Sequence, residues 1–204
     1  MFRKTLLVVF AIMFLGLTVY ADYGYMAKSD RTLTPEPERA LIVFIRPKPS
    51  LGRTLWTDDF GQAISLYDVS EEDTKFIGIL YQKTKVCYDL DPGEYTFMVV
   101  GAVADFMKAT VEPGKTYYVL LSPRVGTWKA RFSFQPLRRS DLESSDFAKW
   151  NSKTDLIENT SDSEAWATEK ADEIEAKRAD NWPAWCELSS ETQAEMTLNS
   201  EDGR

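Results

Sequence analysis

The stretch Asp89-Leu90-Asp91-Pro92-Gly93-Glu94-Tyr95-Thr96-Phe97 decides the fold that we predict for this chain. Proline presets the backbone angle needed at the second position of a turn, and glycine accepts the positive φ that often follows. Beyond the turn, Tyr95, Phe97 and Val99 alternate with Glu94, Thr96 and Met98. A period of two is typical of a β-strand with one buried face. The stretch therefore predicts a turn followed by a half-buried strand.

The sequence on both sides of this stretch shows the same combination of turns and alternating strands. Before the turn, Val86, Tyr88 and Leu90 share one apolar face, which places Cys87 and Asp89 on the opposite face. Runs rich in aromatic and β-branched residues predict strands at 40–46, 62–67, 75–80, 84–90, 95–100, 106–111, 116–121 and 127–134. Seven to eight short strands separated by turns indicate a mainly β protein. We expect residues 40–137 to form an antiparallel β-sandwich.

The composition changes after residue 137. The chain has 24 basic and 32 acidic side chains and a net charge of −8, and residues 137–204 hold 8 of the basic and 17 of the acidic ones. All the net acidity therefore lies in this tail, which also has few glycines. We expect residues 138–204 to form an acidic α-helical extension of the sandwich.

Short sequence motifs in the tail predict where its helices begin and end. The capping-box spacing of Ser140 and Glu143 predicts a short helix that runs through Trp150. The longest helical window is 161–181, with Pro183 expected to break or restart it. Ser190 and Gln193 have the spacing to cap a last short helix.

Several tryptophans lie in this tail, and two of them belong to a regular stripe. Trp166, Ile174 and Trp182 are eight residues apart, and the stems of Lys170 and Arg178 can cover the space between them. Such residues either pack on the outer face of the sandwich or face a partner. A helix lying on a membrane would need basic flanks that this face lacks. The candidate packing or partner-facing aromatic residues are Trp150, Trp166, Trp182 and Trp185.

Residues 1–21 resemble a secretory signal peptide. Arg3 and Lys4 precede an apolar run over 6–17, and Val19-Tyr20-Ala21 is a plausible cleavage site. We expect cleavage and export to the periplasm or the medium, with an uncleaved N-terminal anchor as the alternative. Residues 22–39 lack periodicity and contain Thr34-Pro35-Glu36-Pro37, so we expect a linker or extended arm.

Three motifs resemble those of uncharacterised bacterial envelope proteins, many of them small lipoproteins, that share a transthyretin-like or PEGA-type β-sandwich. The motifs are Ala40-x-Ile42-x-Phe44-x-Arg46-Pro47, Leu90-x-Pro92-Gly93-x-Tyr95 and Pro113-Gly114-Lys115-x-Tyr117-Tyr118-Val119. The likeness covers residues 40–204 and implies a fold and an envelope location. It implies no catalytic residues. This chain departs from the lipoproteins because its start has no lipidation cysteine.

The residue types present exclude several kinds of chemistry. The chain contains no histidine, which removes Ser-His-Asp and Cys-His catalysis and the commonest transition-metal ligand. It has no glycine-rich phosphate loop and no zinc-ligand spacing. The acidic clusters 58–59 and 71–73 lack EF-hand spacing, so we expect solvated loops there and no metal site or cofactor. The acidic balance also argues against nucleic acid as a partner.

The two cysteines leave two alternatives. Cys87 and Cys186 can form a disulfide in an oxidising compartment, which would join the tail to the sheet. Otherwise both stay as partly buried free thiols. Catalytic redox use is disfavoured because the chain has no Cys-x-x-Cys motif.

These observations favour a non-enzymatic protein of the cell envelope. We expect an interaction or structural module whose partner is another envelope protein. The alternative is a periplasmic protein that binds a small apolar ligand in a closed cavity between helix and sheet. Contact with a membrane is expected only if the N-terminal segment is retained.

Overall fold

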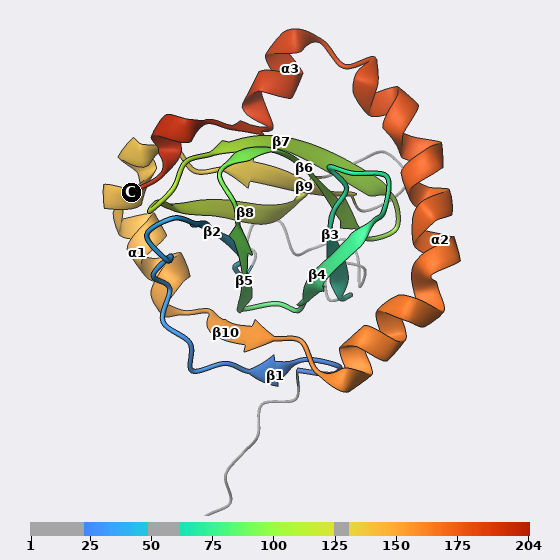
Figure 1. Cartoon of the computed structure of the whole chain (residues 1–204), viewed down its shortest axis with the longest axis horizontal. Coiled ribbons are helices and arrows are strands. Elements are labelled where there is room, and N and C mark those ends of the chain that lie inside the picture. The colour runs from blue at the N-terminus through green and yellow to red at the C-terminus, as the bar shows by residue number, and fades with distance from the viewer. Residues whose placement is uncertain (1–22, 49–61, 125–130) are drawn as a thin grey trace, which may run out of the picture.

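The computed structural model describes residues 23–48, 62–124 and 131–204, and it contains two β-sheets that face each other (Figure 1). One sheet has six strands in the order β1-β10-β5-β2-β8-β9, and the other has five in the order β11-β7-β6-β3-β4. The six strands are β1 Ala27–Lys28, β10 Asp155–Glu158, β5 Thr84–Leu90, β2 Ala40–Arg46, β8 Thr116–Arg124 and β9 Arg131–Pro136. The five are β11 Thr197–Leu198, β7 Ala104–Val111, β6 Gly93–Val100, β3 Ile64–Asp68 and β4 Lys75–Leu80.

The core between the sheets consists of the side chains that the alternating sequence pattern predicted to share a buried face. Phe97 and Val99 of β6 are fully buried there with Val86 and Leu90 of β5. The opposite face of β6 contributes to a second buried cluster, outside the sandwich. The predicted alternation of faces is therefore confirmed, and a mainly β fold with a C-terminal helix is what the chain adopts.

The expectation of a purely antiparallel sandwich with seven to eight strands was incomplete. The described residues form eleven strands, and three strand pairs are parallel: β2 with β8, β10 with β5, and β11 with β7. Side chains alternate with the same period in parallel and antiparallel strands, so the sequence pattern carries no information about strand direction. Of the predicted strand at 127–134, residues 127–130 lie outside the described residues.

The tail also departs from the purely helical extension that we expected, because it supplies two of these strands. Its helical elements are η3 Arg139–Glu143, α1 Ser145–Ser152, α2 Ser161–Cys186, α3 Ser190–Glu195 and η4 Ser200–Asp202. Strand β10 lies between α1 and α2 and extends the six-stranded sheet, while β11 follows α3 and extends the five-stranded sheet. Strand β10 has four residues and β11 has two, so each is too short to show a clear alternation of apolar and polar residues in the sequence.

The helix ends differ from those predicted. Ser144 caps α1 by accepting a hydrogen bond from the backbone of Phe147 (3.1 Å), and Ser189, not Ser190, caps α3. Pro183 does not break α2, which continues to Cys186. The last turn is held because the Trp185 indole is buried and its Nε1 donates to the Phe106 carbonyl (3.1 Å). Tertiary packing here outweighs the proline penalty.

Each sheet has a covered outer face. Helix α2 runs along the outer face of the five-stranded sheet, where Ile174 packs with Met98 (Figure 1). The outer face of the six-stranded sheet is covered by α1 and by the arm that precedes β2. The arm includes β1, which pairs with β10, and Leu33, which packs near Val43. Residues 23–39 are therefore fixed on the sheet over much of their length.

The last residues of the tail connect the two sheets. Strand β11 pairs with β7, and six residues later the backbone of Arg204 exchanges two hydrogen bonds with Thr116 of β8 (2.9 and 3.1 Å). Between them, Arg138 donates to the carboxylate of Asp202 (2.7 Å), which is buried. A charge-assisted bond of this kind fixes the segment because the carboxylate has lost most of its water.

Arg178 fastens α2 to the turn between β3 and β4. Its guanidinium donates to the carbonyls of residues 69, 71 and 72 and to the Thr74 hydroxyl, at 2.9–3.3 Å. We expect Arg178→Met to lower the free energy of unfolding by about 2 kcal/mol, because bonds from a charged donor are lost together. Urea denaturation measures the change.

Lys170→Met is the matched control for this prediction. Lys170 lies two turns earlier on α2, and among the described residues its ammonium is in ion pairs only with Glu169 and Glu173, at 3.7 Å. Such exposed pairs contribute little, so this variant should stay within about 0.5 kcal/mol of the parent. Equal losses for the two variants would contradict the anchoring role of Arg178.

Candidate functional site

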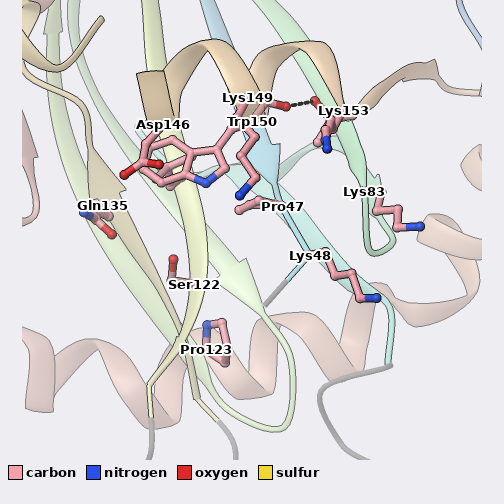
Figure 2. Close-up of a pocket in the computed structure, with 12 residues that line it drawn as sticks. Pro47, Lys48, Lys83, Ser122, Pro123, Gln135, Asp146, Lys149, Trp150 and Lys153 are labelled. Carbon is pink, nitrogen blue, oxygen red and sulfur yellow. Dashed lines mark hydrogen bonds between the residues drawn. The ribbon is translucent and has the colours of Figure 1, made fainter. Parts of the chain in front are cut away.

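A groove of about 690 Å³ opens on the outer side of the six-stranded sheet, between α1 and the ends of strands β2, β8 and β9 (Figure 2). We call it the α1 groove. Its lining residues are Pro47, Lys48, Lys83, Leu120, Ser122, Pro123, Gln135, Asp146, Lys149, Trp150, Lys153 and Thr154. A volume in this range suits a small-molecule ligand.

One face of α1 forms a wall of the groove. Asp146, Lys149, Trp150 and Lys153 have the spacing of a single helical face. Figure 2 shows the Trp150 indole extending from α1 over the strands that carry Ser122 and Gln135. Buried Phe147, three residues before Trp150 and in the same apolar cluster on the sheet, contacts the Tyr118 ring edge-on, with centroids 4.8 Å apart. The Phe147 contact thus holds α1 on the sheet beside the groove.

Lys85 holds the C-terminal end of α1. This lysine of β5 is only 8% exposed, and its Nζ donates to both the backbone carbonyl and the side-chain oxygen of Asn151, at 2.7 Å each. A cation at a helix C-terminus also interacts favourably with the helix dipole. Burial lowers the pKa of Lys85 from its ordinary value. Helix α1, which carries Trp150, is therefore held at both ends, because Ser144 caps its first turn and Lys85 binds its last turn.

The turn between β4 and β5 presents another lysine to the groove. Lys83 has a φ of 63°, in the left-handed region that few residues other than glycine adopt. Its backbone amide donates to the Arg46 carbonyl (2.9 Å), and its carbonyl accepts from the Asp155 amide (2.9 Å). These two bonds join the turn to the end of β2 and the start of β10, and they keep Lys83 at the groove rim.

The charge of the groove is opposite to that of the chain. Four ammonium groups, from Lys48, Lys83, Lys149 and Lys153, accompany the single carboxylate of Asp146. Within the described residues, none of the four lysines is in an ion pair. An anion that enters this groove meets uncompensated positive charge. It also meets an apolar surface, formed by Trp150, Leu120 and the two prolines.

The groove's charged, hydroxyl and apolar side chains can contact a bound ligand. Ser122 lines the groove, but no hydrogen bond joins its hydroxyl to a lysine within the described part of the chain. The same described residues contain no group of three or more cysteine or acidic side chains placed to hold a metal ion. The groove is therefore suited to hold an anion with a flat or apolar part.

The predicted aromatic residues lie in three places. Trp150 is half-buried in the α1 groove. Trp166 packs against Tyr25 and Phe76, with ring centroids 6.1 and 6.2 Å away. Trp185 is buried against β7, and Trp182 stacks on it with 36% of its surface exposed. Only Trp150 of the four belongs to the groove.

The cysteines are not brought together. Both are free: Cys87 is half-buried on the outer face of the six-stranded sheet, and Cys186 is exposed at the end of α2, which covers the other sheet. The sandwich separates them, so the Cys87–Cys186 disulfide is absent and both thiols are free, but Cys186 is exposed and not partly buried as the free-thiol alternative predicted. Of the acidic clusters, residues 58–59 lie outside the described residues. The cluster at 71–73 is exposed, and Glu71 pairs with Lys75 (2.9 Å).

Sequence reasoning missed the lysines of the groove. Lys149 and Lys153 are one helical turn apart, which is a detectable signal once a helix is predicted there. Lys48 follows β2 and Lys83 lies in the turn between β4 and β5, both more than 60 residues away from α1. No local pattern shows that they converge with α1.

Comparisons with known proteins identify no relatives: no protein-family model matches the chain, and no curated protein matches its sequence. Among the described residues, no helix combines the length and apolar character needed to cross a lipid bilayer.

The state of the thiols can be measured directly. We expect thiol titration of the unfolded, unreduced protein to find two free groups. In the folded protein Cys186 should react first, because Cys87 is partly buried and burial raises the pKa of its thiol, which lowers its thiolate fraction. Cys186→Ser should remove the fast phase only. Finding no thiol in the unfolded chain would contradict the free state.

Proposed function

We propose that this chain is a non-enzymatic binding module of the cell envelope, and that the α1 groove holds a small anionic ligand carrying an aromatic or other flat ring. The observation that carries this proposal is the gathering of four lysines around Trp150 on a chain whose net charge is −8. A carboxylate, sulfonate or phosphate would meet the ammonium groups, and the ring would lie against the indole.

The shape and polarity of the groove favour this ligand over a purely apolar one. The small-ligand alternative required a closed apolar cavity between helix and sheet, whereas the α1 groove is open and rimmed by charge (Figure 2). An apolar molecule would leave the lysines without a partner. Ser122, Gln135 and Thr154 offer further hydrogen bonds to a polar ligand.

Export of the chain is part of the proposal. Its support is the charged start, apolar run and small residues of positions 1–21. The resemblance to envelope sandwiches is likewise part of the proposal, and its support is the three sequence motifs. The first motif forms β2, and the Pro-Gly motifs precede β6 and β8. In the second of these turns Gly114 has a φ of 70°, which explains why glycine stands there.

A matched pair of dyes tests the groove. 1-Anilinonaphthalene-8-sulfonate carries an anionic group and aromatic rings, and N-phenyl-1-naphthylamine has the same rings without the charge. We expect the sulfonate to bind saturably by fluorescence titration. Lys149→Gln/Lys153→Gln should weaken it about tenfold, since each exposed ion contact contributes roughly 0.5–1 kcal/mol. The uncharged dye should be unaffected by this change.

Two further variants complete the test. Lys83→Gly removes a rim charge and relieves the positive φ, so weaker sulfonate binding by this variant cannot come from loss of the fold. Lys108→Gln, on β7 of the other sheet, removes one lysine elsewhere and should change nothing. Sulfonate binding that survives all the groove changes would refute the site.

Export has its own test. Expressed with its N-terminal segment in a bacterium, the protein recovered from the periplasm or medium should begin at Asp22, the residue after the Val19-Tyr20-Ala21 sequence. Mass spectrometry of the intact chain measures this. A membrane-bound protein that still starts at Met1 would instead support the uncleaved anchor, and a cytosolic one would contradict export.

A further inference from the structure

The surface around Trp182 has an aromatic ring beside carboxylates, which is the chemistry that the α1 groove suits. Within the described ranges, Trp182 and Tyr25 are the two large apolar side chains that stay exposed. Trp182 lies near the end of α2, outside the five-stranded sheet, whereas α1 and its groove lie outside the six-stranded sheet (Figure 1). The two features therefore lie on opposite sides of one molecule.

The Trp182 indole is held in a fixed position. It stacks on buried Trp185, with ring centroids 5.1 Å apart, and it meets the Phe106 ring edge-on at 5.0 Å. Unlike Trp185, it donates no hydrogen bond within the described part of the chain, so its N–H is free to bond a partner. An aromatic side chain that is already ordered loses little conformational entropy on binding, and tryptophan is prominent among the residues that dominate protein–protein interfaces.

Carboxylates lie next to this ring. Glu175 lines the same hollow of about 280 Å³ as Trp182. The exposed acidic turn 71–73 lies beside it, because Arg178, which also lines the hollow, donates to the carbonyls of residues 71 and 72. Among the described residues Glu72 is in no ion pair, and Glu175 pairs only with Arg178, at 3.7 Å. We call Trp182, Glu175 and the turn 71–73 the Trp182 patch.

The Trp182 patch and the α1 groove are complementary in charge and in size. The patch presents carboxylates and an exposed ring, and the groove presents four lysines and the Trp150 indole. A single indole is smaller than the ligands that a groove of about 690 Å³ holds. Opposite charges steer two such surfaces together and fix their register. Because patch and groove lie on opposite sides of the molecule, their contact joins separate copies of the chain.

We propose that the occupant of the α1 groove is a second copy of this chain, whose Trp182 patch docks there. The inference rests on the function proposed for the groove and names the surface that supplies the anionic aromatic group. The Trp182 ring lies against Trp150, its N–H donates to the side-chain oxygen of Gln135, and the carboxylates of Glu72 and Glu175 meet the lysines. The contact is heterologous, so it leaves one groove and one patch unoccupied and adds further copies in series.

Sedimentation equilibrium of the protein recovered in the export experiment tests this contact. The weight-average mass should rise with protein concentration, with a Kd of about 100 μM, as expected of a small transient interface. An ionic strength of about 1 M, where the Debye length is about 3 Å, should return it to the monomer mass. Saturating 1-anilinonaphthalene-8-sulfonate should do the same, because it occupies the groove. A mass that stays monomeric up to about 1 mM protein overturns the proposal.

Two variants and their mixture show whether the contact runs from patch to groove. Lys149→Gln/Lys153→Gln alters the groove and Glu72→Gln/Glu175→Gln alters the patch, so each should weaken self-association about tenfold. An equimolar mixture should form a one-to-one complex, because the intact patch of the first variant meets the intact groove of the second. The complex should stop at two copies, since its remaining groove and patch are both altered. A mixture that behaves as the sum of its components contradicts the head-to-tail contact.

Matched controls isolate the ring and the carboxylates. Trp182→Ser should weaken self-association about fivefold, and Tyr25→Ser, which removes the other exposed ring, should leave it unchanged. Glu164→Gln/Glu169→Gln removes the same charge as the patch variant from exposed positions in the first turns of α2. It should act within about twofold of the parent, because charges farther away than about 8 Å are screened. Controls that weaken the contact as much as the patch variants overturn the proposal.

The dye titration separates failure of this inference from failure of the function proposed for the groove. Saturable sulfonate binding that Lys149→Gln/Lys153→Gln weakens, with a mass that stays monomeric, leaves the groove as a ligand site and overturns only the second copy as its occupant. Self-association that this groove variant leaves unchanged also overturns the docking, because the copies then meet elsewhere. Loss of both the sulfonate binding and the self-association overturns both proposals.

Discussion

Strand β2 imposes the constraint on which the rest of the structure depends, because both of its faces are buried. Ala40, Ile42 and Phe44 belong to the core between the sheets, and Leu41, Val43 and Ile45 belong to the cluster on the outer side, all with no exposed surface. Burial of one large apolar side chain contributes about 1.5–3 kcal/mol. The outer three side chains therefore require a third layer on the six-stranded sheet. A sandwich of two sheets alone would leave them in water.

The segments that precede and follow the sandwich supply this layer, and the layer accounts for the α1 groove. The arm brings Leu33 to the outer cluster, and the tail brings Leu142 and Phe147. Helix α1 has only eight residues, so within the described part of the chain it covers part of the sheet and does not extend over the ends of β2 and β8 beside it. The groove is thus the place where the covering layer stops, with Trp150 at its boundary. A longer apolar helix would have filled it.

Features that depend on neighbouring residues were predictable from this sequence, and features that depend on contacts between distant segments were not. The bounds of β2, β4 and β5 were predictable to the residue, because alternation and turn chemistry act within a few positions. The outward direction of Cys87 was predictable for the same reason. The separation of Cys87 from Cys186 was not predictable, because a side chain's face does not show which distant element lies opposite. The parallel pairing of β2 with β8, the short strands of the tail and the meeting of Lys48 and Lys83 with α1 all depend on such distant contacts. Even the continuation of α2 through Pro183 depends on the Trp185 contact with β7.

The covering layers also separate charges of opposite sign. The lysines of the α1 groove and the carboxylates of Glu164 and Glu175 on α2 lie outside different sheets, and packed sheets are themselves about 10 Å apart. The Debye length at physiological ionic strength is about 8 Å, so charges on the two outer faces interact weakly through solvent. An acidic chain can therefore keep a basic groove without neutralising it. Each outer face then presents its own electrostatic potential to solvent, because the sandwich holds the two faces farther apart than screening allows their charges to act.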